Sequence, residues 1–345
     1  MDDLITWIHA DENLTELRVL SLIQQADMQN DISQGAGLID NTWSITIPQR
    51  VWEESPILQG HYVYCPGTEW GGPVALVKHQ SAARLITLQG PTWRGLLHQK
   101  RIQPPAGAPY FVVDELEANE AIDFVLGGAF GSLFAVSTEN TGVYVSASYR
   151  YQSMAQGLQN TLRQYGLRLN VVFDNVAGHV LLSAQPAGSL ADQVEISQDY
   201  GVDFVSSIGN VELANHCLAL GSGELENRMV VNVYRTENGY TTTRPSTMPE
   251  SAIRTVLLDY PNAETEEDLI KSAIERLEAV AQQQGIQVNQ ITLSVEAQLG
   301  DRLAVRDRVT GLEAQAEVTN KILNIAGGRV KVQMNVDTVS LELTE

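Results

Sequence analysis

The sequence has few cysteines, and its histidines form no recognisable pattern. Its 345 residues include 2 cysteines, Cys65 and Cys217, which are too far apart for a close-spaced metal or redox motif. We therefore expect two buried free thiols. The 6 histidines show neither HxH nor HExxH spacing, and the adjacent His216 and Cys217 would point to opposite faces of a strand. The sequence therefore predicts no metal ligands and no cofactor.

Basic residues are also scarce, because 22 Lys and Arg stand against 42 Asp and Glu, which gives a formal charge of -20. Proteins that grip nucleic acid do so with Lys and Arg that displace counterions from phosphates. The composition argues against such a protein. It is compatible with a surface that nucleic acid passes without adsorbing, and also with a charge that simply keeps the protein soluble.

Long hydrophobic runs are absent. The longest apolar stretches, such as 171–173 and 229–233, are far shorter than the roughly 20 residues of a membrane-spanning helix, so no transmembrane segment is predicted. The start, MDDLITWIHADEN, has acidic residues where a secretory signal has basic ones. We therefore expect no export by that route and assembly in the cytoplasm.

Motifs for nucleophilic catalysis are missing too. No GxSxG elbow occurs, and neither cysteine lies in a known nucleophile motif. Acidic pairs such as Asp199 with Asp203, or Glu224 with Glu226, are expected by chance among 42 acids, and the sequence cannot give the separation a hydrolase needs. We predict no catalytic residues and no enzymatic activity.

Tryptophan is confined to the first 93 residues, at Trp7, Trp43, Trp52, Trp70 and Trp93. Exposed tryptophans could form a sugar-binding cleft. However, Trp43 alternates with polar residues on the same strand face as Ile45 and Ile47, which favours a role in a core or a subunit interface.

What is present is a β-rich pattern at both ends of the chain. Short β-branched or aromatic runs separated by Gly, Pro, Asp and Asn predict an N-terminal domain over 1–103 that forms a small, partly open barrel. Its predicted strands are 17–23, 42–47, 62–64, 74–78 and 84–88. A short helix begins near Pro91, and Pro104, Pro105, Gly107 and Pro109 then mark a boundary.

The middle region, 104–285, is predicted to be α+β. Helices are expected over 115–127, with Phe124 inward, and from an N-cap at Ser148 to Gly166. A hairpin follows over 167–183. The clearest helix is 265–284, with a capping-box spacing from Thr265 to Asp268. A β-rich C-terminal segment, 286–345, contains a turn at Gly327 and Gly328.

The stretch 197–235 combines a strand, the glycine loop Gly221-Ser222-Gly223 and a returning strand. A glycine loop after a strand can hold phosphate, but this chemistry needs a following helix or a P-loop lysine. Here Glu224, Glu226 and a second strand follow, so we interpret the glycines as turn residues.

Five motifs occur along the chain, and their order identifies a protein family more specifically than any single motif does. They are EWGGPV (69–74), LQGPTWRGLLHQKRIQPPAGAPY (88–110), SQDYGVDF (197–204), NHCLALGSGELENRMVVNVYR (215–235) and GDRLAVRDRVTGLEAQAEVTNKILNI (300–325). Together they resemble the siphovirus tail proteins that form baseplate hubs in phages and prophages of Gram-positive bacteria. One departure is GDRLAV, where the family pattern has an apolar residue after Gly-Asp.

The resemblance implies a homotrimer in which two β-barrel-like domains per chain form a pseudo-sixfold ring that continues the tail tube. It implies a place at the virion tail tip, with the distal tail protein, the tape-measure protein and other baseplate proteins as partners. DNA would pass through the lumen without specific binding. A tail-associated cell-wall or glycan hydrolase and a carbohydrate-binding receptor module are the alternatives.

Overall fold

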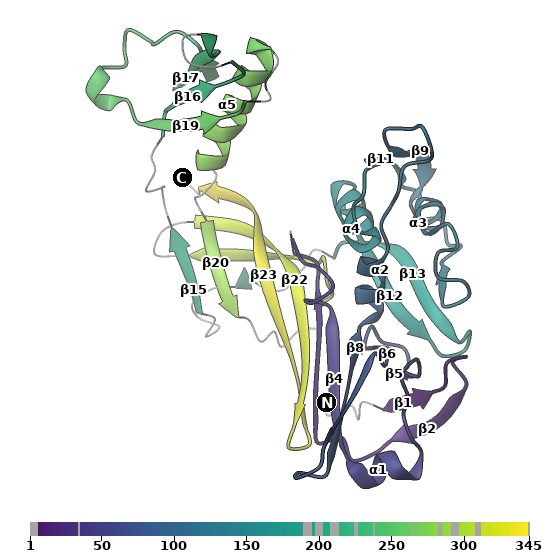
Figure 1. The fold of residues 1–345 in the computed structure, drawn as a ribbon. Coiled ribbons are helices and arrows are strands. Elements are labelled where there is room, and N and C mark those ends of the chain that lie inside the picture. Colours follow the sequence, from purple (N-terminus) through teal and green to yellow (C-terminus); the bar gives the residue numbers. More distant parts are fainter. Residues whose placement is uncertain are drawn as a thin grey trace. The chain divides into compact units, whose positions relative to one another are not determined.

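The chain forms two compact units, and the computed structural model describes most of each (Figure 1). The described residues are 6–33, 35–188, 195–196, 203–207, 214–223, 227–236, 239–261, 263, 265–281, 285–290, 297–307 and 312–343. The first unit contains 1–203, 288–305 and 315–339, and the second contains 204–287, 306–314 and 340–345. The first unit therefore combines the N-terminal part of the sequence with strands from its C-terminal part.

The longest sheet runs in the order β14-β21-β22-β3-β4-β8-β7, and β23 also pairs with β22. Its strands are β3 (Gln25–Asp31), β4 (Thr42–Pro48), β7 (Leu76–Gln80), β8 (Leu85–Pro91), β14 (Glu195–Ile196), β21 (Arg302–Asp307), β22 (Leu312–Ala326) and β23 (Arg329–Leu343). Figure 1 shows the yellow β22 beside the purple N-terminal strands. The join is the antiparallel pairing of β3 with β22, from Asp31 opposite Asn320 to Gln25 opposite Ala326.

Side chains that alternate along β4 form the core of this sheet. Trp43, Ile45 and Ile47 are buried, as predicted, and they pack with Met28 of β3 and Leu323 of β22. Residues from both ends of the sequence thus share one apolar cluster, which stabilises their pairing through buried area. The turn at 327–328 between β22 and β23 is confirmed, and both glycines have positive φ.

Two glycines allow β8 to approach the neighbouring sheet β2-β1-β5-β6 closely. This sheet contains β1 (Trp7–Ala10), β2 (Glu16–Leu20), β5 (Tyr62–Tyr64) and β6 (Gly71–Pro73), and the helix α1 (Gln49–Glu54) follows β4. A Cβ atom on Gly72 would lie 2.0 Å from the Pro91 carbonyl oxygen, and one on Gly90 would lie 1.9 Å from that of Pro73. These glycines belong to the motifs EWGGPV and LQGP, so those motifs mark a backbone contact.

A mixed α/β layer completes the first unit. The hairpin predicted over 167–183 is confirmed, because β12 pairs antiparallel with β13 along its whole length. The layer consists of α2 (Trp93–Gln99), β9 (Phe111–Glu117), α3 (Ala118–Leu126), β10 (Phe134–Val136), β11 (Tyr144–Tyr149), α4 (Met154–Gln164), β12 (Leu167–Asp174) and β13 (His179–Pro186). The segment 103–110, rich in proline, has no regular structure, also as predicted.

Three predicted element boundaries are wrong because pairing between distant residues takes priority over local pattern. The segment 111–117 pairs with β11 as a strand, so α3 starts at Ala118, and the predicted inward Phe124 is 51% exposed. Ser148 lies in β11, and Ser153 caps α4 by accepting a hydrogen bond from the Gln156 amide at 3.3 Å. The strand predicted over 17–23 ends at Leu20, and β3 was not predicted at all.

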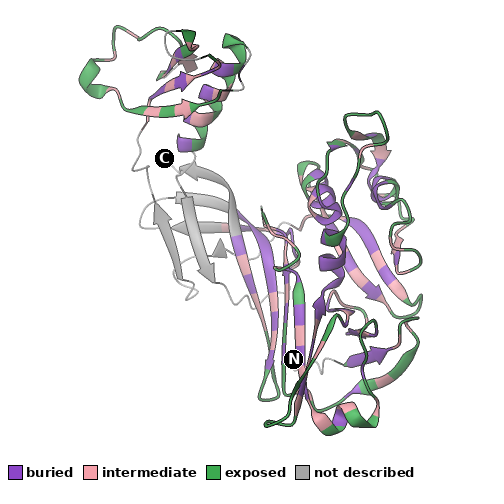
Figure 2. Ribbon diagram, viewed as in Figure 1, coloured by how far each residue is buried: buried purple, intermediate pink, exposed green. Residues whose placement is uncertain are grey.

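Helix α2 is buried on nearly every side. Six of its seven residues, Trp93 to His98, are buried, including Arg94 and His98 (Figure 2). Thr92 caps the helix by accepting a hydrogen bond from the Gly95 amide at 3.2 Å. Because most buried helices are apolar all round, the arginine and the histidine here need an explanation from their surroundings.

The second unit contains the sheet β18-β17-β16-β19 and helix α5. Its elements are β16 (His216–Leu220), β17 (Val230–Thr236), β18 (Gly239–Thr241), the 3-10 helix Glu250–Ala252, β19 (Thr255–Asp259) and α5 (Glu266–Ala281), while β15 (Asp203–Ser207) pairs with β20 (Gly285–Gln290). The Asp268 amide donates to the Thr265 hydroxyl at 3.2 Å, which confirms the predicted cap.

The strand, loop and returning strand predicted within 197–235 are present as β16 and β17, which pair antiparallel. The Gly221 amide donates to the Met229 carbonyl at 2.8 Å and closes the loop, so the glycines serve a turn. Buried Cys217, Ala219, Val231 and Val233 pack on Leu269, Ala273 and Leu277 of α5. Residues 224–226 and 197–202 lie outside the described part.

The chain is mostly β-sheet with few helices, as predicted in outline. Within the described ranges no sheet closes into a barrel, because the C-terminal strands extend the N-terminal sheet instead of forming a separate one. The division at residues 103 and 285, and the arrangement of two tube-like domains around a middle region, stay predictions.

The close approach at Gly90 is testable by adding one methyl group. We expect Gly90→Ala to lower the free energy of unfolding by at least about 2 kcal/mol, because the Pro73 backbone cannot move aside freely. Gly37→Ala is the matched control, since its nearest neighbour would lie at 3.9 Å. Denaturant titration measures both, and equal stability of the two variants would contradict the prediction.

Candidate functional site

A cavity with a volume of about 630 Å³ lies within the first unit. It is bounded by the loop 67–70, by Arg94 of α2, by β12 and β13, by the segment 297–299, and by β22 and β23. Arg168, Asn170 and Val172 alternate on the strand face that lines it, and Val332 and Met334 add an apolar wall. A volume of this size suits a small molecule.

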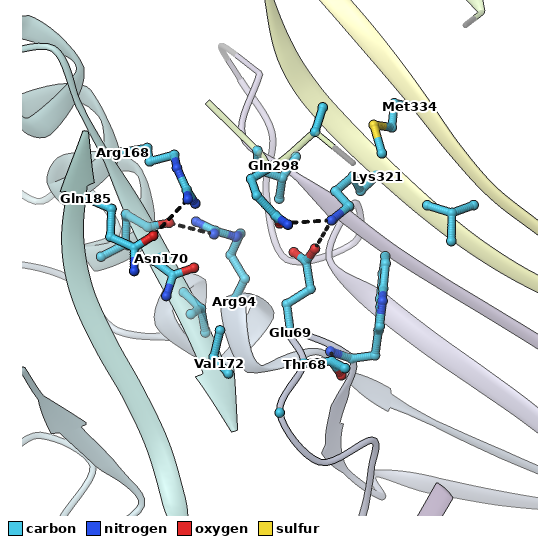
Figure 3. A pocket seen from close by; sticks show the side chains of 17 residues that line it. Thr68, Glu69, Arg94, Arg168, Asn170, Val172, Gln185, Gln298, Lys321 and Met334 are labelled. Carbon is cyan, nitrogen blue, oxygen red and sulfur yellow. Dashed lines mark hydrogen bonds and ion pairs between the residues drawn. The ribbon is translucent and has the colours of Figure 1, made fainter. Parts of the chain in front are cut away.

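The charged groups of the cavity are three cationic side chains and one carboxylate, in a chain that is strongly acidic overall. In Figure 3 Arg94 lies on the side of Arg168, Asn170 and Gln185, while Lys321 lies on the side of Gln298 and Glu69. The pairing of each cation therefore decides the electrostatic character of the site.

Lys321 is paired with Glu69. Its Nζ lies 2.6 Å from a Glu69 carboxylate oxygen and 3.1 Å from the Gln298 side-chain oxygen, and it lies over the Trp70 ring. The Asn30 amide donates to the other Glu69 oxygen at 3.3 Å. Both charged side chains are about nine-tenths buried, so this ion pair joins the 67–70 loop to β22 in a low-dielectric setting.

Arg168 is paired with Asp301. Its Nε lies 3.4 Å from an Asp301 oxygen, and its Nη2 donates to Gln185 at 2.7 Å. The Asp301 carboxylate also accepts backbone hydrogen bonds from Gly188 and Gln298. This carboxylate is thus fully engaged, and it offsets the charge of Arg168.

Arg94 has no carboxylate in contact among the described residues. It is 3% exposed, and its Nη2 donates to the Leu169 carbonyl at 3.0 Å, whereas Nε and Nη1 find no acceptor in the described part of the chain. Burial lowers the pKa of Arg94 to about 10; the Glu69 charge opposes this shift and Arg168 adds to it. The side chain therefore remains a cation at neutral pH.

Sequence reasoning did not single out Arg94. The pattern of this short helix, with Trp93, Leu96 and Leu97 on one side, does not reveal that Arg94 is buried as well. The acidic residues weighed for hydrolysis fall outside the described part of the chain: Asp199, Glu224 and Glu226 entirely, and Asp203 in its side chain.

Two buried histidines form a second titratable cluster, away from the cavity. His9 of β1 and His61 stack, with His9 Nε2 2.8 Å from His61 Nδ1. Burial, and after it the nearby His61 and Arg18 charges, lower the pKa of His9 to about 4, against a smaller opposite effect of Asp11. His98 of α2 is similar, because burial and then Arg94 and Arg101 lower its pKa to about 4.

The remaining predicted positions fall into the core. Cys65 and Cys217 are both free and buried, as predicted, and burial raises the pKa of each thiol. Four of the five tryptophans, all but Trp52, are buried, which confirms the core interpretation for them. None of the helices in the described ranges is long and apolar enough to span a membrane.

Comparison with known proteins gives a match in structure alone. No family model matches the sequence, and no curated protein matches it. The fold is similar to the 43 kDa tail protein of prophage MuSo2 from Shewanella oneidensis, at 12% identity and a TM-score of 0.53, over 96% of this chain and 98% of that one.

It is also similar to prophage tail protein gp18 from Listeria monocytogenes EGD-e, at 12% identity and a TM-score of 0.51, over 97% of this chain and 94% of that one. The chain has the fold of prophage tail proteins. The resemblance to tail proteins is therefore confirmed at the level of the fold, and the restriction to Gram-positive hosts stays a prediction.

The Lys321–Glu69 pair is testable by a double-mutant cycle. We expect Glu69→Gln to destabilise the chain by about 3 kcal/mol, because it leaves the ammonium buried opposite a neutral amide. Adding Lys321→Met should recover much of that loss. Denaturant titration of the wild type, both single variants and the double variant measures the coupling, and strictly additive losses would refute it.

The buried histidines predict a loss of stability in mild acid. The pKa of His9 is lower in the folded chain than the roughly 6.5 of an unfolded one, so the unfolded state binds more protons between pH 6.5 and about 4. Stability should thus fall as the pH falls through this window.

We expect His9→Gln to flatten that fall, whereas the exposed His79→Gln should leave it unchanged. Thermal unfolding at intervals between pH 7 and 4 measures the slope. The same slope in His9→Gln as in the wild type would show that this histidine does not contribute.

Proposed function

We propose that the chain is a structural hub protein at the tail tip, or baseplate, of a phage or phage-like particle. The observation that carries this proposal is the likeness in fold to two prophage tail proteins over nearly the whole of each chain. The five ordered sequence motifs support the same class independently of the fold. On this proposal the function lies in assembly, and the protein is not an enzyme.

The proposed assembly is a homotrimeric, pseudo-sixfold ring that continues the tail tube. The open end of the longest sheet supports it, because β7 pairs with β8 alone among the described strands and most of its residues are exposed. An open sheet edge presents unpaired backbone groups that another strand can use. We infer that β7 contributes to contact between copies, with Leu76, 44% exposed, in the interface.

The proposed partners are the distal tail protein, the tape-measure protein and other tail-tip proteins, in a virion assembled in the host cytoplasm. DNA would pass through the lumen without specific binding. The formal charge of -20 supports this role, because a wall of like charge repels the duplex and keeps it from adsorbing. Acidic residues confined to the outside of the ring, with a neutral or positive lumen, would argue against it.

Light scattering on the purified chain tests the proposal. We expect a mass three times that of the 37.8 kDa chain for the protein alone, or that mass plus the mass of the bound partner when the distal tail protein is added. Leu76→Asp should reduce assembly without loss of folding, and Leu58→Asp, at 52% exposure in a loop, is the control. A chain that stays monomeric with its partner present, or that digests cell-wall glycan, would contradict a structural hub.

A further inference from the structure

Arg94 is a buried cation that the fold leaves without a counter-ion. Lys321 and Arg168 each contact a carboxylate, whereas Arg94, which lines the same cavity, has two nitrogens without an acceptor among the described residues. Removing a charge from water is costly unless a partner compensates it. A charge of this kind in the wall of a cavity of about 630 Å³ indicates a ligand.

We propose that this cavity binds a small molecule through an oxyanion group, a phosphate or a carboxylate, held by Arg94. The guanidinium group suits such oxygens because its donors are planar and fixed in direction. Nothing in this proposal depends on the hub function or on the trimer.

The rest of the lining fits an anion with an organic body. The Asn170 and Gln185 side chains place neutral hydrogen-bonding groups on the Arg94 side of the cavity, and the Val332 and Met334 side chains offer an apolar surface. Glu69 does not cancel the positive field, because Lys321 holds its carboxylate at 2.6 Å. The site is therefore positive where the chain as a whole is negative, which selects anions by local charge.

Binding is measured on the full chain with two probes, inorganic phosphate and succinate, against sodium chloride at the same ionic strength. We expect at least one probe to raise the midpoint of thermal unfolding and to give a saturable isotherm by calorimetry, since a ligand that binds the folded state stabilises it. A response to phosphate alone would identify the bound oxyanion as a phosphate, and a response to succinate alone would identify it as a carboxylate. No effect of either probe beyond that of chloride would overturn the proposal.

Two variants locate the effect. Arg94→Met keeps a long side chain without charge, and it should abolish the shift. Asn170→Asp keeps the shape of Asn170 and its hydrogen-bonding distance of 3.3 Å to Ser183, but places a carboxylate in the lining. Because the new carboxylate can pair with Arg94, Asn170→Asp should raise the midpoint of thermal unfolding in the absence of any probe. It should also remove the rise in midpoint that the probes cause, whereas Asn170→Ala should still show that rise.

If Arg94→Met does not fold, the two variants Asn170→Asp and Asn170→Ala still test the proposal. A probe response of equal size in Asn170→Asp and in the wild type would place the anion elsewhere and overturn the assignment. Loss of the response in Asn170→Asp, with the response kept in Asn170→Ala, would support it.

Discussion

The pairing of β3 with β22 is the interaction on which the first unit depends. It joins strands from opposite ends of the sequence, and every strand of the longest sheet lies on one side or the other of it. Side chains strengthen this pairing, because the Asn320 amide donates to Asp31 at 2.8 Å. Arg163 of α4 supports it from outside the sheet, by an ion pair with Glu317 of β22 at 2.9 Å and a hydrogen bond to the Ile32 carbonyl, just after β3, at 3.3 Å. Without this pairing β4 would lose its apolar neighbour Leu323, and the ion pair between Lys321 and Glu69 could not form.

The pairing of β3 with β22 also explains why a polar cavity exists inside a β-rich unit. The C-terminal strands bring Lys321 and Met334 opposite β12, which belongs to another sheet, and opposite the 67–70 loop, which connects β5 with β6. The surfaces that meet are only partly apolar, because β12 presents Arg168 and Asn170 on that face. Ion pairs neutralise most of the charge that this meeting buries, and Arg94 is the exception that the described contacts do not compensate.

Local pattern predicted the elements whose periodicity is strong. The alternation of Trp43, Ile45 and Ile47, the hairpin 167–183 and the capped helix α5 could all be read from the sequence, since each depends on neighbours a few residues away. Strand β3, QADMQND, contains no β-branched residue, and only the neighbouring β4 and β22 make it a strand. Arg94 was missed for a similar reason, because its burial depends on elements that cover α2 from several parts of the chain.

The distance between β3 and β22 along the chain, 289 residues from Asp31 to Asn320, also has a consequence during synthesis. At ribosomal rates of roughly 5–20 residues per second, β22 emerges about 15 to 60 s after β3. Through that interval β3 has a partner on one edge only, and the other edge is open to any strand nearby. A nascent chain therefore presents two open sheet edges, at β3 and at β7. Once β22 has paired with β3, only the edge at β7 remains open of these two, so a complete chain differs from an incomplete one in the number of its open edges.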